Sequence, residues 1–159
     1  MKVVIVEDEK LLQRELKAQL QVYEDIEIVQ YMQTVEDAVA WLSGHASDID
    51  LIFMDIELAD GVCFEIFEAI DLVTPIIFLT AYSEYAIRAF KVNSVDYLLK
   101  PINPDELEVA LVKFRDRLAK ESKVSVDLST LKEFYSKSDE NKKTRLLVQS
   151  GDTYKYLDI

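Results

Sequence analysis

The chain has 159 residues, 50% of them hydrophobic, which is enough for one well-packed domain but not for two large ones. Its 30 acidic residues outnumber its 18 basic ones, and a net charge of -12 makes the chain as it stands poorly suited to binding nucleic acid. The single cysteine, Cys63, excludes an internal disulfide and is expected to be a packed core residue. No apolar run is long enough to span a membrane, and the first residues are too quickly charged for a signal peptide, so we expect a cytoplasmic protein.

Five short apolar runs recur along the chain, and each predicts a β-strand. They cover residues 3–6, 26–29, 51–54, 76–79 and 95–99. Several are continuous rather than alternating, which is typical of strands that are covered on both faces.

Helical patterns lie between these runs. Apolar residues at helical spacing mark the first four helices: Leu12, Leu16, Leu20 and Tyr23; Ala38, Trp41 and Leu42; Phe64, Ile66, Phe67 and Ile70; Ala86, Ile87 and Phe90. We expect Thr34 to cap the second helix, which stops near Gly44, and Ser83 to cap the fourth.

The fifth helix has the clearest start. Asn103 is a candidate cap, Pro104 takes the first helical position and Glu106 follows three residues after the cap. A stripe of Leu107, Leu111, Phe114 and Leu118 follows. The regular alternation of strands and helices predicts an α/β fold: a doubly wound, five-stranded parallel sheet of flavodoxin-like order 2-1-3-4-5, with helices on both faces.

The character of the chain changes near residue 122. Residues 122–143 are polar and read as a linker that is helical in part, whereas residues 144–159 read as two strands around a Ser-Gly-Asp turn. A lone hairpin is unstable in water, so we expect these strands to open a further domain or to pair with another chain. The first domain would then span residues 1–121.

Polar side chains follow the strands at the edge where a parallel sheet binds ligands. The first strand delivers Glu7 and Asp8, the third Asp55, the fourth Thr80 and the fifth Lys100. Carboxylates this close repel one another, and Mg²⁺ prefers such oxygen ligands, whereas zinc or iron would favour His or Cys. The edge therefore predicts a Mg²⁺ site at which Asp55 can act as a nucleophile toward a phosphoryl group.

Each of these residues alone has an ordinary interpretation. A single acid at a strand end is usually a loop residue in water, Thr80 alone is a turn residue, and Lys100 alone is a surface charge. Their joint placement at the ends of different strands is what makes the pattern specific. His45, the chain's one histidine, is expected to be a plain surface residue.

The motifs V-E-D at 6–8, F-M-D at 53–55, L-T-A at 79–81 and D-Y-L-L-K-P at 96–101 resemble those of the receiver domain of a two-component response regulator. The resemblance covers roughly residues 1–120. It implies that Asp55 accepts a phosphoryl group from a phosphohistidine on a sensor histidine kinase, and that the module is not an enzyme beyond self-phosphorylation from small donors and autodephosphorylation.

The same resemblance assigns roles to the neighbouring residues. Asp8, Asp55 and the carbonyl of Glu57 would bind Mg²⁺ directly, and Glu7 would act through a metal-bound water. Thr80 and Lys100 would contact the phosphoryl oxygens, and the Lys100-Pro101 bond would be cis. The loop after Asp55 is shorter than usual in the family and lacks its proline, which bears on loop shape and on the dephosphorylation rate.

The phosphoryl state would be sensed by Thr80 and by Tyr97, which resembles the family's switch aromatic; Tyr97 alone also reads as a half-buried strand residue. The fourth helix, fifth strand and fifth helix would form the responding face, and we expect it to control formation of a homodimer. Its charged residues are Glu84, Arg88, Lys91, Asp96, Lys113, Arg115 and Asp116.

The stretch T-R-L-L-V-Q-S-G-D resembles the start of a LytTR-type DNA-binding domain. This implies a transcription regulator that binds DNA only through the rest of a truncated output domain, so no DNA-contacting residue can be named. Two alternatives remain open. One is a Mg²⁺-dependent phosphatase with Asp55 as nucleophile and Glu57 as general acid, and the other is a receiver-like interaction domain that works without phosphorylation.

Overall fold

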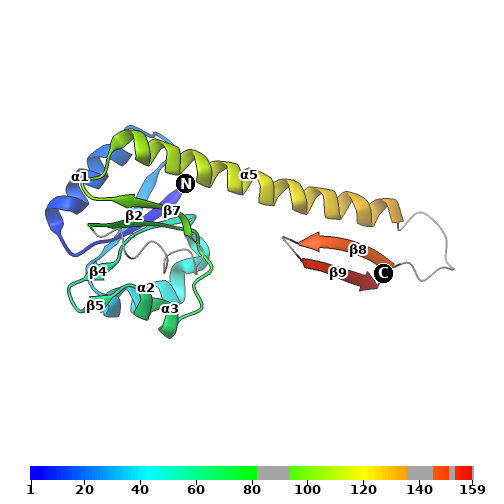
Figure 1. Ribbon diagram of the computed structural model, residues 1–159, viewed down its shortest axis with the longest axis horizontal. Coiled ribbons are helices and arrows are strands. Elements are labelled where there is room, and N and C mark those ends of the chain that lie inside the picture. The colour runs from blue at the N-terminus through cyan, green and yellow to red at the C-terminus, as the bar shows by residue number, and fades with distance from the viewer. Residues whose placement is uncertain (82–93, 136–144, 151–152, 159) are drawn as a thin grey trace. The chain divides into compact units, whose positions relative to one another are not determined.

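The computed structural model describes residues 1–81 and 94–120 in full, and the backbone of residues 121–135, 145–150 and 153–158. The elements, shown in Figure 1, are β1 (Lys2–Val6), α1 (Lys10–Leu20), β2 (Glu27–Met32), α2 (Val35–His45), a 3-10 turn (Ala46–Asp48), β3 (Leu51–Asp55), β4 (Glu57–Leu58), β5 (Gly61–Val62), α3 (Phe64–Ala69), β6 (Ile76–Thr80), β7 (Ser94–Leu99), α5 (Pro104–Tyr135), β8 (Arg145–Ser150) and β9 (Thr153–Asp158).

Five strands form one parallel sheet in the order β2-β1-β3-β6-β7, which confirms the predicted fold class and strand order. The three inner strands are the continuous apolar runs of the sequence. Every residue of β3 and β6 is buried, as are the last four of β1. Burial on both faces explains why these strands lack alternation.

Helices cover both faces of the sheet (Figure 1). Side chains of α1 and α5 pack on one face, where Leu16 and Phe114 belong to the same core cluster as Phe53. Those of α2 and α3 pack on the other, where Leu42 and Ile66 join a second cluster. This double layer holds the carboxyl ends of the strands at one fixed edge.

The predicted helix starts are confirmed at two caps. The Asp37 backbone N–H donates to Thr34 Oγ1 at 3.0 Å, and the Asp105 N–H donates to Asn103 Oδ1 at 2.9 Å. The buried stripe of α5 ends at Phe114, because Leu118 is 37% exposed.

Three features differ from the sequence expectations. The second strand extends to Met32, since Tyr31 and Met32 continue its pairing with β1. The loop after Asp55 contains a small antiparallel hairpin, β4–β5, which the sequence reading missed. The expected fourth helix falls in residues 82–93, outside the described residues, together with its proposed cap Ser83.

The chain divides into two compact units, residues 1–117 and 118–159. In the second, α5 continues to Tyr135, and β8 and β9 form an antiparallel pair on either side of the predicted turn. Within the described parts of the chain, no helix combines the length and apolar character needed to cross a membrane.

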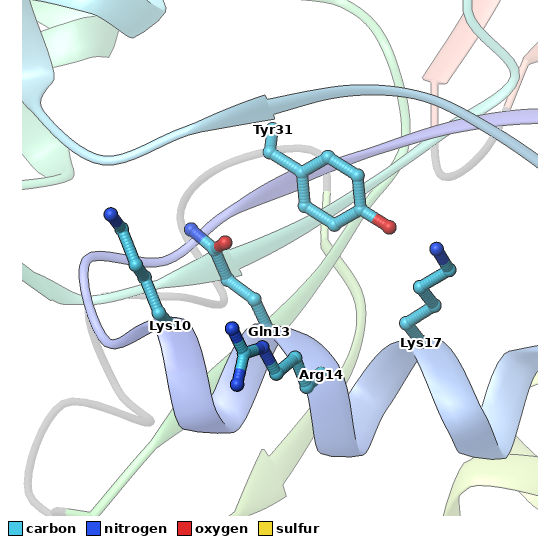
Figure 2. A pocket seen from close by; sticks show the side chains of 5 residues that line it. All are labelled: Lys10, Gln13, Arg14, Lys17 and Tyr31. Atoms are coloured by element: carbon cyan, nitrogen blue, oxygen red, sulfur yellow. The ribbon is translucent and has the colours of Figure 1, made fainter.

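Helix α1 buries one face and exposes another. Leu16 and Leu20 are buried, whereas Lys10, Arg14 and Lys17 are exposed on the side next to β2 (Figure 2). The helix therefore separates the core from a basic surface.

Candidate functional site

The four strand ends that the sequence singled out meet at the carboxyl edge of the sheet. Glu7 follows β1, Asp55 ends β3, Thr80 ends β6 and Lys100 follows β7. The parallel ladder continues into the site, because the Lys100 N–H donates to the Thr80 carbonyl at 2.8 Å and the Glu7 N–H to the Met32 carbonyl at 2.9 Å. The backbone thus fixes where these side chains start.

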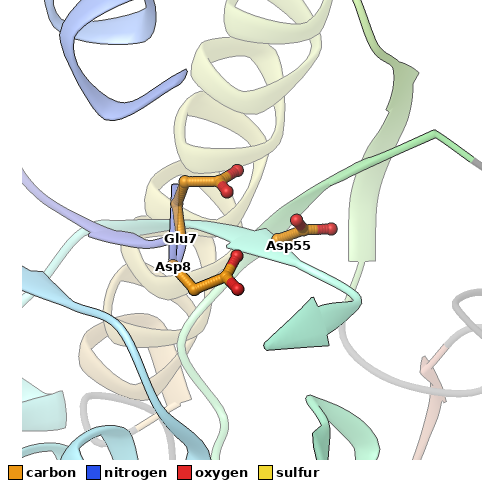
Figure 3. A group of neighbouring side chains, drawn as sticks. All are labelled: Glu7, Asp8 and Asp55. Atoms are coloured by element: carbon orange, nitrogen blue, oxygen red, sulfur yellow. The ribbon is translucent and has the colours of Figure 1, made fainter. Parts of the chain in front are cut away.

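Three carboxylates converge at this edge. One oxygen from each of Glu7, Asp8 and Asp55 lies within 4.8 Å of the others, and Figure 3 shows the three side chains as neighbours at this edge. Glu7 is only 1% exposed and Asp55 6% exposed, whereas Asp8 is half-buried. Such burial of acids requires compensating charge.

Lys100 supplies part of that charge. Its Nζ lies 2.6 Å from Glu7 Oε2 and 2.5 Å from Asp55 Oδ2, and its side chain is 12% exposed. The ammonium therefore bridges the two most buried carboxylates and holds the Asp55 carboxylate in place.

The site perturbs the acidity of its members. Burial, opposed by the Lys100 hydrogen bond and reinforced by the charge of Asp55, raises the pKa of Glu7 to about 7. Burial also raises the pKa of Asp55 against the pull of Lys100. Burial alone would lower the pKa of Lys100, but Asp55 and Glu7 outweigh it and raise that pKa. The single ammonium of Lys100 is insufficient to neutralise the three clustered carboxylates.

Two contacts that sequence reasoning missed support the loop after β1. The Gln13 side-chain amide donates to the Glu7 carbonyl at 2.6 Å, and the Glu9 N–H donates to Glu7 Oε1 at 3.1 Å. Gln13 carries no chemical signal in the sequence. Its role follows only from the turn that brings α1 back over β1.

The loop after Asp55 is held at both ends. The Glu57 N–H points to Asp55 Oδ1 at 3.4 Å, and the side chain of Glu57 is exposed. At the hairpin turn, Asp60 Oδ1 and Oδ2 accept from the backbone N–H groups of Val35 and Glu36 at 2.6 and 3.1 Å. Asp60 thereby ties this loop to the start of α2.

Thr80 and Tyr97 lie on neighbouring strands. Thr80 is 1% exposed, and Tyr97 is half-buried opposite Phe78 in the β6–β7 register. Since alternate strand residues share a face, Thr80 lies on the same face as Phe78, where Tyr97 packs against the core. The two predicted switch residues therefore share one face of the sheet.

The remaining sequence expectations concern single residues. The Lys100-Pro101 peptide bond is cis, as expected. Cys63 is fully buried. His45 is exposed and stacks on Trp41 with ring centroids 4.5 Å apart, which agrees with a surface residue.

The donor set fits Mg²⁺. All three carboxylates offer hard oxygen ligands, and Asp8 is accessible enough to leave room for metal-bound waters. Three carboxylates around one ammonium leave an excess of negative charge that a divalent cation would offset, and burial, which raises the pKa of both Glu7 and Asp55, adds to the need for it.

Comparison with known proteins agrees with this fold and edge. Residues 3–112 match the model of the response regulator receiver domain. The sensory transduction protein LytT of Bacillus anthracis is 37% identical over 72% of this chain and 47% of its own length. The transcriptional regulatory protein BtsR of Salmonella typhi is 38% identical over 76% of this chain and 50% of its own length. The sensory transduction protein LytR of Staphylococcus epidermidis is 30% identical over 89% and 56%, respectively.

Solved structures are similar in the same region. The response regulatory domain of mrkE from Klebsiella pneumoniae superposes with a TM-score of 0.64 at 33% identity, covering 76% of this chain and 99% of that one. The N-terminal domain of a response regulator/sensory box/GGDEF protein from Carboxydothermus hydrogenoformans gives 0.63 at 31% identity, covering 76% and 98%.

The chain therefore belongs to the response regulator receiver domain family, a signalling family that binds Mg²⁺ at an acidic pocket and is phosphorylated by sensor histidine kinases. Its relatives LytT, BtsR and LytR are response regulators of the LytTR family, as the sequence resemblance indicated. The chain spans about half the length of these curated relatives.

Proposed function

We propose that the chain is a phosphoacceptor module in which Asp55 receives a phosphoryl group from the phosphohistidine of a sensor histidine kinase. The proposal rests on the position of Asp55 at the carboxyl edge of the sheet, where its carboxylate lies among Glu7, Asp8 and Lys100 at the ends of separate strands. Family membership supports it.

In the transfer, an Asp55 carboxylate oxygen forms a bond to phosphorus as the nitrogen–phosphorus bond of the donor imidazole breaks. Lys100 already lies 2.5 Å from Asp55 Oδ2, so its ammonium can follow the negative charge onto the new phosphoryl oxygens. Asp8, Asp55 and the carbonyl of Glu57 would hold Mg²⁺, with Glu7 acting through a bound water. The ion would supply charge neutralisation and a fixed position for a phosphoryl oxygen.

Thr80 and Tyr97 would act together as a conformational switch, because they lie on the same face of the sheet. A phosphoryl group adds nearly two negative charges and strong hydrogen-bond acceptors, which the Thr80 hydroxyl can approach. Movement of Thr80 toward the site changes the space beside Tyr97. Two existing states then shift in population, and the face that includes β7 and α5 changes its affinity for a second copy.

Phosphorylation of the receiver domain would regulate transcription. The relatives BtsR and LytR support a LytTR-type DNA-binding domain for which β8 and β9 are the first strands, in a cytoplasmic regulator that forms a homodimer when phosphorylated. Residues 1–121 would be the receiver domain and residues 122–143 the connection to this output.

A Mg²⁺-dependent phosphatase is the second candidate, because Glu57 lies two residues beyond Asp55, where a general acid would stand. The exposed side chain of Glu57 favours the receiver instead, since a general acid works best when it is partly desolvated.

Beryllofluoride, a mimic of the phosphoryl group, separates the candidates when combined with a turnover assay. We expect a fluorine NMR signal of the bound mimic that requires Mg²⁺ and disappears in Asp55→Asn, with no sustained hydrolysis of p-nitrophenyl phosphate. Continuous hydrolysis that depends on both Asp55 and Glu57 would instead establish the phosphatase. Full binding of the mimic by Asp55→Asn would refute the acceptor assignment.

A further inference from the structure

The strongest unassigned feature is the basic face of α1. Lys10, Arg14 and Lys17 are spaced by four and three residues, so they project from one side of the helix. All three are exposed, and none of them forms an ion pair with another described residue. In a chain with a net charge of -12, three exposed cations side by side form a basic patch.

These cations line a groove between α1 and β2. Figure 2 shows Lys10, Arg14 and Lys17 along the helix, with the Tyr31 ring on the strand above them and its hydroxyl directed toward Lys17. Together with Gln13 they enclose a hollow of about 250 Å³. The Gln13 amide already donates to the Glu7 carbonyl, so the three cations and the Tyr31 hydroxyl are the main donors that the hollow offers to a ligand.

The groove continues into a second hollow, whose lining is partly apolar. Lys17 and Tyr31 also border a second space of about 240 Å³, whose other lining residues are Leu20, Gln21, Ile26 and Ile28. β2 lies at the end of the strand order, so among the described strands it pairs only with β1 and the groove is open along its side. A ligand lying along α1 would meet positive charge first and apolar surface next.

The shape and charge select the class of ligand. Drug-sized ligands are mostly buried in concave pockets of roughly 300–1,000 Å³, whereas each of the two hollows here, at about 250 and 240 Å³, is smaller and the cations are exposed. Nucleic acid requires a long track of cations, and the molecule's negative charge opposes it. A short acidic peptide segment needs only two or three cations along its path, and salt screens its repulsion from acids that lie more than roughly 10 Å away.

We propose that the groove between α1 and β2 is a docking surface for an acidic segment of a partner protein, with carboxylates at Lys10, Arg14 and Lys17 and an apolar side chain beside Ile26 and Ile28. The segment follows the helix for about 10 Å, the rise over the seven steps from Lys10 to Lys17. The surface is separate from the phosphoacceptor chemistry, and binding does not require Asp55.

The test uses the whole chain and a fluorescein-labelled peptide of repeated glutamate pairs and leucines, with a matched peptide in which glutamine replaces glutamate. Fluorescence anisotropy should show binding of the acidic peptide that weakens as salt is added. Arg14→Glu should weaken it at least about tenfold, because it replaces the central attraction by repulsion. Lys2→Glu makes the same charge change at an exposed lysine that does not line the groove, and should alter the affinity less than about twofold.

Thermal unfolding checks that Arg14→Glu folds. Lys17→Glu, at a residue that lines both hollows, is a second variant that should also weaken binding of the acidic peptide. NMR should show that the peptide shifts the ring signals of Tyr31. Equal binding of both peptides, or equal loss in Lys2→Glu, would overturn the proposal. Tighter binding of an oligothymidylate would assign the groove to nucleic acid, and loss of self-association in Arg14→Glu would assign it to a second copy; either result also overturns the proposal.

Discussion

Lys100 holds the Glu7 and Asp55 carboxylates together in surroundings that exclude most water. The Glu7 side chain is 2% exposed and that of Asp55 is 8% exposed, so neither charge is well solvated. Because burial disfavours the charged form, the pKa of Glu7 is raised from an ordinary value of 4.5 to about 7. The acidic site is thus destabilising for the folded chain whenever all its carboxylates are ionised and no cation is bound.

Stability without metal should therefore fall as pH rises through this range. A carboxyl whose folded pKa lies above its unfolded value contributes stability that is complete below about 4.5 and lost as pH approaches about 7. The upper bound of this loss is about 3 kcal/mol, from the shift of the Glu7 pKa. Urea unfolding across this pH range, without divalent metal, should show the loss in the native chain. In Glu7→Gln, the free energy of unfolding should depend less on pH. The same pH dependence in this variant as in the native chain would show that Glu7 is not its source.

The neighbours of Glu7 should move its pKa in opposite directions. Lys100→Met removes the cation and should raise the pKa of Glu7 further, whereas Asp55→Asn removes a like charge and should lower it. Carbon-13 NMR of the Glu7 carboxyl group measures both shifts in metal-free protein. Shifts of the same sign in the two variants would be incompatible with the bridge that Lys100 forms.

Among the elements, the short β4–β5 hairpin stabilises the start of α2. Its turn residue Asp60 satisfies two backbone donors at the start of α2, while Thr34 satisfies a third. Burial, the largest single effect, raises the pKa of Asp60, but the backbone hydrogen bonds together outweigh it and hold this pKa below its ordinary value. Asp60 thus adds stability at pH above its unfolded pKa, and this contribution is lost as pH falls through the lower folded value.

Asp60→Ala should lower the free energy of unfolding by about 1 kcal/mol at neutral pH, as expected for the loss of a helix cap. Asp71→Ala removes an exposed acid from the loop after α3 and serves as the matched control. Urea unfolding of both variants measures the difference. An Asp60→Ala variant as stable as Asp71→Ala would show that the cap does not contribute.

The elements that the sequence predicted well are those whose signal is local. Continuous apolar runs marked β1, β3 and β6, and the Asn103-Pro104 pair marked the start of α5, because these signals depend on a few adjacent residues. The β4–β5 hairpin has only two residues on each strand, too few for any period.

The candidate site was predictable for a related reason. In a parallel sheet the strand ends share an edge, so Glu7, Asp55 and Lys100 could be placed together without coordinates. The supports from Gln13 and Asp60 depend on how α1 and α2 return over the sheet, and nothing in the adjacent sequence specifies that path.

In the whole molecule, the proposed switch links the buried site to an exposed surface. Leu99 on β7 is 44% exposed and Val109 on α5 is 53% exposed, and both line one hollow with Tyr97. Apolar residues on a surface that changes with phosphorylation are suited to a symmetric contact.

Leu99→Asp should therefore weaken the dimer that beryllofluoride and Mg²⁺ induce by at least about tenfold, because it places a charge in an apolar contact. Val22→Asp introduces the same charge at a residue that is 73% exposed after α1, and should leave the dimer intact. Light scattering during size-exclusion chromatography measures both variants. Equal dimerisation of the two would show that the contact lies elsewhere.

Intact mass after incubation with acetyl phosphate measures whether Asp55 accepts a phosphoryl group in a Mg²⁺-dependent site. The native chain should gain the mass of one phosphoryl group only when Mg²⁺ is present, and Asp55→Asn should gain none. An adduct of equal yield in Asp55→Asn would show that another residue is the acceptor, and one in the native chain without divalent metal would show that the site does not depend on Mg²⁺.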